Sequence, residues 1–476
     1  MNIHWEVMVI LLPIVAALSC FLWPGRSIWI GLINTFTIVL SVAGLSLQVV
    51  EQGAGRYAVG GWEAPLGIAL VSDGLSLLML MVTAVVGLAI SVYSSCYFNQ
   101  HKARHFWPLW MLLWAALNAL FLSADIFNIY VTLELMGLAA VALVALAGGK
   151  NSLGAAMRYL LVSLLGSLFY LLGVVLLYHS FGTVDMSLLA QRLESSPAVW
   201  AAMGLMTSGL LLKTALFPLH FWLPPAHGNA PAPVSALLSA LVVKASFYIL
   251  LRLWLEVFPV ASFEAGQLLG LLGAAAVLWG GVLALRQTRL KLMIAYSTVM
   301  QIGYLFLAFP LASIAGWKAA VYLLLSHALA KTAMFMAAGN ILLYEGHDRI
   351  AELDRVAQRL PMTLGAFALA GVSLMGLPPS GGFIGKWLLL EAAIRSGQWW
   401  WGIVLIAGGL LTGAYVFKVI GFAFTQSNLP HESRAVPIGM EWAALFMAML
   451  AIGLGFIAPW ILSIMDTGSP FGVATR

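Results

Sequence analysis

The sequence is dominated by apolar stretches of about 20 residues, separated by short polar loops. A helix rises about 1.5 Å per residue, so about 20 apolar residues cross the hydrocarbon layer of a bilayer. The 476 residues are 62% hydrophobic and only 9% charged, whereas about 25% of the residues of a soluble domain are charged. The sequence therefore predicts an all-α polytopic membrane protein in which residues 1–476 form a single membrane domain.

We expect about fourteen transmembrane helices on the template of a 20-residue apolar span. The predicted spans are residues 5–23, 28–48, 69–95, 106–122, 126–147, 156–180, 199–217, 232–255, 265–285, 291–311, 316–342, 362–390, 400–424 and 440–464.

The basic residues in the loops predict an orientation. Alternate loops fall on two sides of the membrane, and the side with more Lys and Arg is expected to be cytoplasmic. This places both termini on the outer face of the cell inner (plasma) membrane. The net charge of +5 lies in short loops and requires no nucleic-acid partner. The richer side carries Arg26, Lys102, Arg104, Lys150, Arg158, Arg286, Arg289, Lys291, Arg349, Arg355, Arg359 and Arg434, and the poorer side carries Arg56, Arg192, Arg252, Lys318, Arg395 and Arg476.

Two of the spans are predicted to be broken helices. The seventh contains Lys213 and then Pro218, Pro224 and Pro225, and the twelfth contains the run Leu-Pro-Pro-Ser-Gly-Gly at 377–382. Proline removes a backbone donor and interrupts a helix, and broken backbone at membrane depth is tolerated only where it is buried in protein or lines a cavity.

Matching breaks in two halves of a transporter point to its ion path. We therefore predict two inverted five-helix repeats, with spans four to eight matching spans nine to thirteen. The first half-channel would cover about residues 106–255 and the second about residues 265–424.

Four ionisable residues lie inside the apolar stretches: Glu134, Lys213, Lys244 and Lys386. Such a charge costs at least about 2.5–3.5 kcal/mol near the bilayer centre, so it is functional by default. Glu134 is the only carboxylate well inside a span, and Lys213 is its natural partner. We interpret Glu134 and Lys213 as a pair whose interaction weakens and strengthens as protons pass, and prefer this to a fixed structural ion pair. For Lys213 we also prefer this role to an ammonium that reaches out to the membrane interface.

Further polar residues in the second half extend this set. His327 and Lys331 are four residues apart, which places them on one helix face, and histidine titrates near physiological pH. We favour a proton relay over a satisfied core histidine. Gln301 supplies a hydrogen-bonding position. Arg158, at the start of the sixth span, is equally well explained as an interfacial charge or as a modulator of the Glu134–Lys213 pair.

Motifs for enzymatic chemistry are absent from the sequence. We find no glycine-rich phosphate loop, metal-ligand cluster or nucleophile constellation, and therefore predict no cofactor, no metal and no catalysis by the chain alone. Whether it is a subunit of a translocase or of an oxidoreductase complex stays open. His220 and His227 flank a proline-rich hairpin, where an access route to the proton path is a better explanation than a metal site.

The order of these residues resembles a known family. The run from Lys213 (Lys-Thr-Ala-Leu-Phe-Pro-Leu-His-Phe-Trp-Leu-Pro-Pro-Ala-His-Gly-Asn-Ala-Pro-Ala-Pro-Val-Ser-Ala-Leu), followed by Lys244, is similar to the hallmark of antiporter-like subunits. These occur in respiratory complex I, membrane-bound hydrogenases and Mrp-type cation/proton antiporters. Supporting motifs are Asp73-Gly-Leu-Ser-Leu-Leu, Glu134, Arg289-Leu-Lys-Leu-Met-Ile-Ala-Tyr-Ser-Thr, His327-Ala-Leu-Ala-Lys331 and Gly376-Leu-Pro-Pro-Ser-Gly-Gly-Phe-Ile-Gly-Lys386.

The resemblance implies fourteen helices, two inverted half-channels and a polar axis along the membrane plane. It assigns the paired residues to Glu134 and Lys213, the connecting lysine to Lys244, the relay to His327 and Lys331, and the terminal lysine to Lys386. Two positions depart from many members of the family. Gln301 stands where some have histidine, and Arg158 stands where many have lysine; arginine steers charge but does not carry a proton.

The leading hypothesis is a proton-translocating subunit of a multisubunit membrane complex, most simply the D-type component of an Mrp cation/proton antiporter. The alternative is a proton-pumping subunit of a complex I-like or hydrogenase-type redox complex. Expected partners are other membrane subunits, protons and the lipid bilayer, with sodium left open for the complex as a whole. A quinone-binding redox subunit and an inert scaffold are the competing hypotheses.

Overall fold

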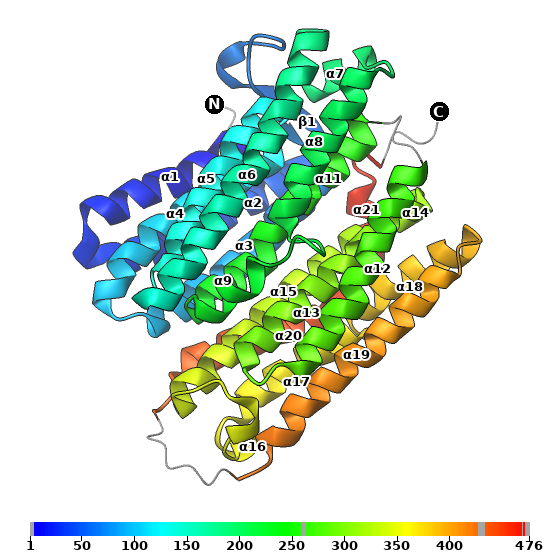
Figure 1. Ribbon diagram of the computed structural model, residues 1–476. Coiled ribbons are helices and arrows are strands. Elements are labelled where there is room, and N and C mark those ends of the chain that lie inside the picture. Colours follow the sequence, from blue (N-terminus) through cyan, green and yellow to red (C-terminus); the bar gives the residue numbers. More distant parts are fainter. Residues whose placement is uncertain (1–3, 259–262, 427–433, 469, 472–476) are drawn as a thin grey trace.

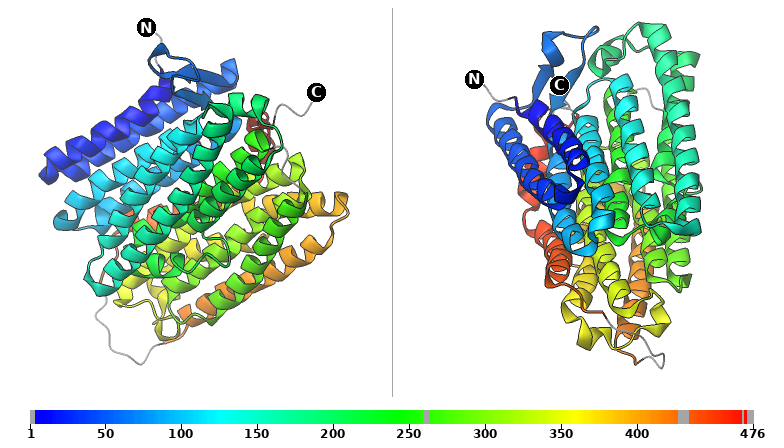
Figure 2. Two further views of the ribbon diagram at one scale, coloured as in Figure 1. Left: turned by 45° about the horizontal axis from the view of Figure 1, so that its top comes forward. Right: turned by 90° about the vertical axis from the view of Figure 1, so that its left-hand side faces the viewer.

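The computed structural model is built almost entirely of helices that run side by side across the molecule (Figure 1, Figure 2). It describes residues 4–258, 263–426, 434–468 and 470–471. Within these ranges, 12 helices are long and apolar enough to cross a membrane. The prediction of an all-α polytopic membrane protein is confirmed.

The N-terminal half of the helical bundle contains the segments up to residue 257. They are α1 (Trp5–Leu22), η1 (Pro24–Arg26), α2 (Ser27–Gln52), β1 (Gly55–Ala58), η2 (Val59–Gly61), β2 (Ala69–Ser72), α3 (Gly74–Tyr97), α4 (Gln100–Leu122), α5 (Ile126–Ala145), α6 (Gly149–Phe181), α7 (Met186–Arg192), α8 (Pro197–Thr214), α9 (Leu223–Asn229), α10 (Ala232–Leu237), η3 (Leu238–Val242), α11 (Val243–Arg252) and η4 (Leu253–Val257).

The C-terminal half lies alongside it (Figure 1). Its segments are α12 (Phe263–Arg286), α13 (Leu290–Phe306), α14 (Ala308–Leu311), α15 (Ile314–Glu345), η5 (Ile350–Glu352), α16 (Val356–Arg359), α17 (Pro361–Met375), α18 (Gly381–Arg395), α19 (Trp400–Ala423), α20 (Ile438–Gly453), η6 (Leu454–Phe456) and α21 (Ala458–Met465).

The third predicted span begins too early. Residues 69–72 form strand β2, which pairs antiparallel with β1 so that Gly55 faces Ser72. Helix α3 begins only at Gly74, because the carboxylate of Asp73 accepts the backbone N–H of Ser76 at 2.9 Å and caps the helix. The predicted single fourteenth span is also wrong, since α20 and α21 are separated by the short η6.

Both predicted helix breaks are confirmed. Helix α8 ends at Thr214 and α9 begins at Leu223, while α17 ends at Met375 and α18 begins at Gly381. At the first break Ala215 has a φ of 59°, and at the second Gly376 has a φ of 81°. The seventh span therefore ends three residues before its predicted boundary, and the twelfth is two helices rather than one. The inversion of the repeats stays a prediction.

The eighth span is a continuous helix of mixed winding. Residues 232–257 contain two π-helical turns, η3 and η4, on either side of α11. This helix and α15 are buried along the whole of their apolar windows, whereas α1, α2 and α19 are only one-third buried. The centre of the molecule is therefore formed by residues 232–257 and α15, which pack against each other through α10 and η3.

The two ends of the bundle differ in charge. At one end the ring of His4 lies 4.9 Å from that of Tyr57 on β1, and Thr467 accepts the backbone N–H of Gly74 at 2.7 Å. The start of α1 and the end of α21 therefore share the end that carries the β-hairpin. We call it the hairpin end.

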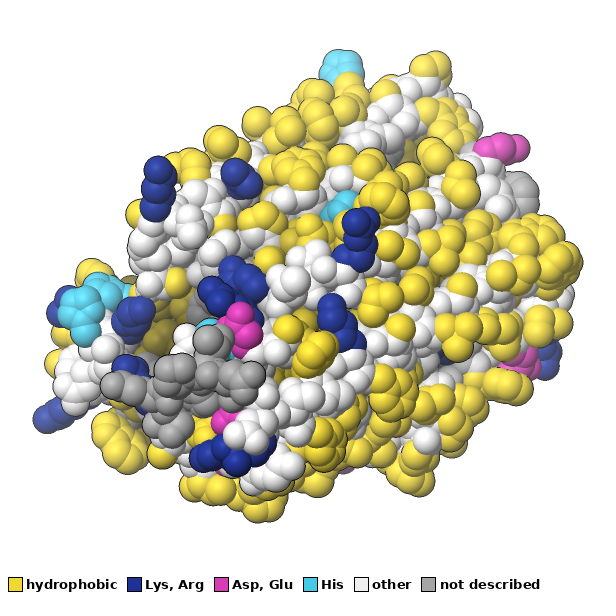
Figure 3. All heavy atoms as spheres, turned by 60° about the horizontal axis from the view of Figure 1, so that its bottom comes forward, with side chains coloured by type: hydrophobic (Ala, Val, Ile, Leu, Met, Phe, Trp, Pro, Cys, Tyr) yellow, Lys and Arg dark blue, Asp and Glu magenta, His cyan; other side chains and the backbone are white. Residues whose placement is uncertain are grey.

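At the opposite end, which we call the basic end, Lys and Arg side chains gather (Figure 3). The backbone N–H of Leu290 donates there to the carbonyl of Asp348 at 2.7 Å. The charge asymmetry agrees with the predicted loop pattern, but two residues in that pattern are not loop charges. Arg252 is 2% exposed and bonds to Asp73, and Lys291 is 2% exposed and donates to the carbonyl of Ala230. Arg476 lies outside the described residues.

Candidate functional site

At the first helix break, a lysine and a glutamate lie together as predicted. The Nζ atom of Lys213, at the end of α8, is 3.6 Å from Oε1 of Glu134 on α5. Two serines of α6 complete the group: Lys213 donates to Ser163 Oγ at 2.9 Å, and Ser167 donates to Glu134 Oε1. Helix α6 packs closely on both α5 and α8, which brings the four side chains together.

The two members of this pair differ in their access to the surface. The Lys213 side chain is 4% exposed, whereas that of Glu134 is 21% exposed. Around Glu134 the surface is apolar, because Val131, Leu135 and Leu168 are exposed on α5 and α6. Glu134 therefore connects the buried lysine with a lateral, apolar face of the bundle.

Arg158 is not brought to this pair. It is exposed on α6, and no polar contact from it to Glu134 or Lys213 is found among the described residues. Its modulating role remains a prediction.

Lys244 lies directly after the π turn η3. It is 1% exposed, and its Nζ donates to the backbone carbonyl of Ser239 within that turn. A π turn opens the regular hydrogen-bond ladder of a helix and often marks a functional position. Among the described residues there is no direct contact between Lys244 and Lys213, so the link between these two lysines stays a prediction.

Helix α13 places one hydroxyl beside Ser239 and another beside Lys331. The Ser239 and Thr298 hydroxyls lie 2.9 Å apart. Ser297, the residue before Thr298, accepts a hydrogen bond at Oγ from Lys331. Lys331 also donates to the carbonyl of Ile294 at 3.0 Å. Lys331 is fully buried on α15.

His327 lies one turn before Lys331 and is 3% exposed. Neither of its ring nitrogens has a hydrogen-bond partner among the described residues. A buried polar atom without a partner costs about 1–3 kcal/mol, so this ring is poorly explained as a satisfied core histidine. Its charged neighbours are Lys244, Lys331 and Lys386, which places it between the central and the terminal lysines.

Lys386 lies at the second break. It is the last of Glu134, Lys213, Lys244, His327, Lys331 and Lys386, which we call the row. Its Nζ donates to the carbonyls of Leu374 and Met375 at 2.8 and 3.1 Å, and lies 4.4 Å from the centre of the Tyr304 ring. Gln301 of α13 donates to the same Leu374 carbonyl at 3.2 Å. Helix α13 therefore touches both ends of the second half of the row, through Ser297 at Lys331 and Gln301 at Lys386.

Two further buried basic residues were not among the predicted proton-transfer residues, although His227 was predicted to lie on an access route to the proton path. His227 on α9 is 1% exposed, stacks on Phe335 at 5.0 Å and leaves Nδ1 without a partner among the described residues. Lys291 begins α13 and lines a cavity of about 530 Å³ together with Lys102, Arg289 and residues 228–231. Lys291 was misjudged because it directly follows a loop, and its contact with Ala230 is 61 residues away in sequence.

Comparison with known proteins identifies the family of this chain. Residues 123–412 match the family described as NADH:quinone oxidoreductase/Mrp antiporter, transmembrane. The matched segment contains every member of the row. The chain belongs to this family.

Similar antiporter-like proteins occur in assemblies of two kinds. The chain is 35% identical to NADH-quinone oxidoreductase subunit N of Desulforudis audaxviator, covering 96% of this chain and 95% of that protein. It is 27% identical to the D-type component of the Na(+)/H(+) antiporter of Bacillus subtilis, covering 97% and 96%. Its structure matches a chain of the Mrp complex from Dietzia sp. with a TM-score of 0.89 and 25% identity, covering 98% and 97%.

The antiporter-like subunit is thus a multi-pass membrane protein whose relatives are parts of larger membrane complexes. Within the described residues, no group of three or more His, Cys, Asp or Glu side chains is placed to hold a metal ion.

Proposed function

We propose that this antiporter-like subunit moves protons along the membrane plane, through Glu134, Lys213, Lys244, His327, Lys331 and Lys386. The observation that carries the proposal is the arrangement of the second half of the row. Lys331 bonds to Ser297 of α13, and Lys386 shares the Leu374 carbonyl with Gln301 of the same helix. Lys244 bonds to the carbonyl of Ser239, whose hydroxyl lies 2.9 Å from that of Thr298. A buried lysine holds its proton weakly when it lacks a counter-ion, because desolvation disfavours the ammonium.

The hydrogen-bonding groups between the lysines support transfer over short steps. A hydroxyl both donates and accepts, so Ser297 is suited to exchange a proton with Lys331. Thr298 and Ser239 are suited to pass one between α13 and the turn that holds Lys244. Gln301 cannot carry a proton in this way and would orient a water molecule or hold the Leu374 carbonyl. His327 would accept a proton on either ring nitrogen, since both lack partners among the described residues.

The cavity at Lys291 is the inlet that we infer for this row. It opens at the basic end and is lined by polar and basic groups, including Lys102 and Arg289. Behind it lies His227, whose charged neighbours are Lys291, Lys244 and Lys331. Protons from the basic end would therefore enter near the middle of the row, between the two halves.

The partly exposed Glu134 supports a partner protein at the lateral face of α5 and α6. A carboxylate on an apolar surface at membrane depth is costly unless protein covers it. A second membrane protein that covers the exposed residues Val131, Leu135 and Leu168 would place Glu134 at the contact between subunits.

For the whole assembly we favour a cation/proton antiporter, because the chain aligns over nearly its full length with the D-type component of such a system. The 35% identity with a subunit N of an NADH-quinone oxidoreductase supports a redox-driven complex as the second candidate. Copurification of the native complex separates them. Small hydrophobic subunits alone would support the antiporter, and iron–sulfur or flavin proteins would support the redox complex.

Proton transport by the purified complex in proteoliposomes tests the role of the row. Glu134→Ala and Lys213→Ala should each abolish coupled transport while the complex still assembles. Glu391→Gln is the control, because Glu391 is an exposed carboxylate paired with Arg395 at 2.6 Å outside the row. Normal transport by an assembled Lys213→Ala complex would contradict the proposal.

The proposed orientation places the basic end in the cytoplasm and the hairpin end outside. The exposed Cys96 lies near the end of α3, at the basic end, and Val59→Cys would place a thiol on the hairpin, where Val59 is 43% exposed. In intact cells a membrane-impermeant maleimide should label Val59→Cys in a Cys96→Ser background and should spare Cys96. The reverse pattern would invert the topology.

A further inference from the structure

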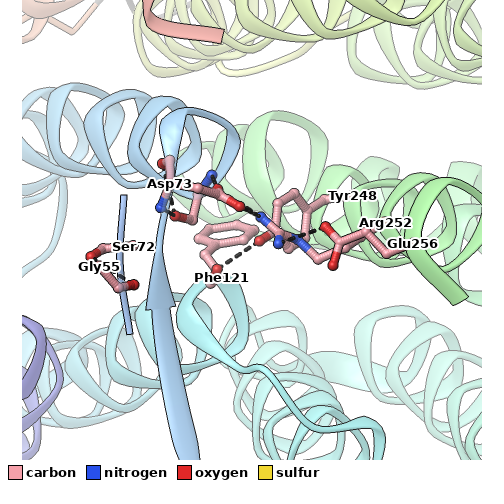
Figure 4. Close-up of polar contacts among 8 residues, drawn as sticks. Gly55, Ser72, Asp73, Phe121, Tyr248, Arg252 and Glu256 are labelled. Atoms are coloured by element: carbon pink, nitrogen blue, oxygen red, sulfur yellow. Dashed lines mark hydrogen bonds and ion pairs between the residues drawn. The ribbon is translucent and has the colours of Figure 1, made fainter. Parts of the chain in front are cut away.

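An ion cluster at the hairpin end lies outside the row described above. Arg252, at the end of α11, bonds through Nη2 to both carboxylate oxygens of Asp73 at 2.8 and 2.9 Å. Through Nη1 it bonds to Glu256 Oε1 at 2.9 Å. Figure 4 shows the guanidinium between the two carboxylates, with the Tyr248 ring beside it. We call Asp73, Arg252 and Glu256 the outer triad.

The charge of the outer triad does not balance. Arginine stays protonated in proteins, so two ionised carboxylates and one guanidinium leave a net charge of −1. The Arg252 side chain is 3% exposed and that of Asp73 is 1% exposed, and burying an uncompensated charge is costly. The binding of a single proton to one carboxylate would make the cluster neutral.

Glu256 is the carboxylate suited to bind that proton. Asp73 accepts hydrogen bonds from both Arg252 and the backbone of Ser76, and it stands at the N-terminus of α3, where the helix dipole favours a negative charge. Glu256 has the bond to Arg252 alone among the described residues, and its side chain is 17% exposed. It is therefore both the less stabilised carboxylate and the more accessible one.

The surroundings of Glu256 offer no second cation. The charged groups that face it among the described residues are Arg252 and Asp73. Helix α7 packs against η4, but its Arg192 is exposed and donates to the carbonyl of Phe181 at 3.2 Å. In addition, Nε of Arg252 has no partner among the described residues although the residue is 2% exposed. The guanidinium thus keeps a buried donor that is free to bond when a carboxylate or water rearranges.

The triad is aligned with the central lysine of the row. Lys244, Tyr248, Arg252 and Glu256 follow one another at intervals of four residues on a single helix, so they share one face. Tyr248 separates Lys244 from the triad, because its hydroxyl donates to the Phe121 carbonyl at 2.6 Å and its ring lies under Arg252 at 5.1 Å. In this arrangement Lys244 and the triad influence each other through their charges rather than through a direct hydrogen bond.

We propose that Asp73, Arg252 and Glu256 form a one-proton site that is loaded from the hairpin end through Glu256 and whose charge is coupled to that of Lys244. On loading, a proton from water at that end forms an O–H bond with the Glu256 carboxylate, and the triad changes from −1 to neutral. The negative triad favours a charged Lys244, and the neutral triad lets Lys244 release its proton. This site deepens the function proposed above and rests on it.

The size of the coupling follows from the helix geometry. Twelve residues of the helix separate Lys244 from Glu256, which corresponds to about 18 Å at about 1.5 Å per residue. At an effective dielectric constant of about 20, two unit charges at that distance change each other's proton affinity about fivefold. Because a charged Lys244 favours the ionised carboxylate, removing that charge should raise the proton affinity of Glu256 about fivefold.

The experiment uses the whole complex in proteoliposomes, with the pH set separately on the two sides. Glu256→Gln keeps an oxygen for Arg252 but cannot titrate, so transport should lose its dependence on the pH at the hairpin end. Glu256→Asp should restore that dependence. The matched control is Glu391→Gln, which alters another Glu–Arg pair, four residues apart and exposed, and should leave the profile unchanged. A wild-type profile in Glu256→Gln would overturn the proposal.

Infrared difference spectra of the same complex give a second measure that does not need transport. A carboxyl band should titrate in the wild type, shift in Glu256→Asp, and titrate with about fivefold higher proton affinity in Lys244→Gln. An unshifted titration in Lys244→Gln would refute the coupling. If the wild type itself moves no protons, the function proposed above fails. If Lys213→Ala abolishes transport but Glu256→Gln keeps its pH profile, only the outer triad proposal fails.

Discussion

A lysine lies beside each of the two helix breaks, but the two lysines are stabilised by different means. At the first break Lys213 faces the carboxylate of Glu134 at 3.6 Å. At the second break Lys386 faces no carboxylate among the described residues, and the last two carbonyls of α17 and the Tyr304 ring surround it instead. One lysine thus has a full counter-charge, and the other has the partial negative charge of a helix C-terminus.

This difference separates two tasks that a row of lysines must perform. A carboxylate partner stabilises the ammonium form of the lysine. The lysine then loses its proton only when the two side chains separate or the carboxylate is protonated. Backbone carbonyls attract the ammonium less strongly than a carboxylate does, and protonation does not neutralise them. A proton is therefore easier to remove from a lysine that contacts only carbonyls. We therefore expect the first break to act as the controlled end of the row and the second break as the end that exchanges protons freely.

The largest effect is expected when either lysine is removed. Lys213→Met and Lys386→Met should each lower proton transport by at least about a hundredfold, the usual contribution of a positioned proton-transfer group. Proton flux into proteoliposomes measures this loss, and Lys318→Met is the control because Lys318 pairs with Asp466 away from the row. If Lys386→Met transported normally, the two breaks would not be equivalent in function at all.

The second effect is on the stability of the protein, and it is expected to differ between the two helix breaks. Lys213→Met leaves the Glu134 carboxylate without its cation. Lys386→Met leaves only two backbone carbonyls without the lysine, and one of them still accepts a hydrogen bond from Gln301. We expect the unfolding free energy of the protein to fall by about 1–3 kcal/mol more in Lys213→Met than in Lys386→Met. Thermal unfolding of the purified complex measures it. The double variant Glu134→Gln/Lys213→Met should recover stability, and its failure to do so would mean that the ion pair is not the cause.

A smaller effect is expected at Gln301, which shares the Leu374 carbonyl with Lys386. In Gln301→Leu this carbonyl bonds to the lysine alone, so the ammonium is held more strongly by about 1 kcal/mol. Transport should slow about fivefold. The control is Gln287→Leu, because the side-chain amide of Gln287 donates to the Leu283 carbonyl of α12 at 3.0 Å, away from Lys386. Faster transport in Gln301→Leu would show that the glutamine acts on the proton path in another way.

The smallest effect is expected at Tyr304. A cation over an aromatic ring gains at least about 0.5 kcal/mol, so Tyr304→Leu should weaken the hold on the Lys386 ammonium and change transport by at least about twofold. Tyr304→Phe keeps the ring and should behave as the wild type. Equal effects of the two substitutions would assign the role to the hydroxyl instead of the ring.

The sequence was sufficient for the membrane-spanning architecture and for the pairing of Glu134 with Lys213. The apolar stretches and the proline-rich interruptions have direct physical causes, so the helices and both breaks were predicted from them. The strand at 69–72 was missed because Ala-Leu-Val-Ser continues an apolar run into α3, and periodicity alone does not separate a short buried strand from the start of a helix.

What the sequence could not provide were contacts between distant residues. Arg252 was predicted as a loop charge because it lies near a span end, yet its partner Asp73 lies 179 residues earlier in the chain. The role of α13 could not be predicted either, because nothing in the sequence distinguishes Ser297 and Thr298 from other polar residues. Only the structure shows their contacts with Lys331 and Ser239. Arg158, by contrast, was identified from its charge and lies apart from the pair it was expected to modulate.

The π turns around α11 have a consequence for the direction in which its side chains point. A π turn holds one residue more than an α turn, and one residue corresponds to about 100° of rotation about the helix axis. With η3 wound as an ordinary α turn, Lys244 would point about 100° away from its present direction. Deleting one residue from 238–242 would therefore turn the Lys244 side chain away from its present neighbours without changing the lysine itself. The winding of the preceding turn, as much as the identity of the residue, determines which groups this charge contacts.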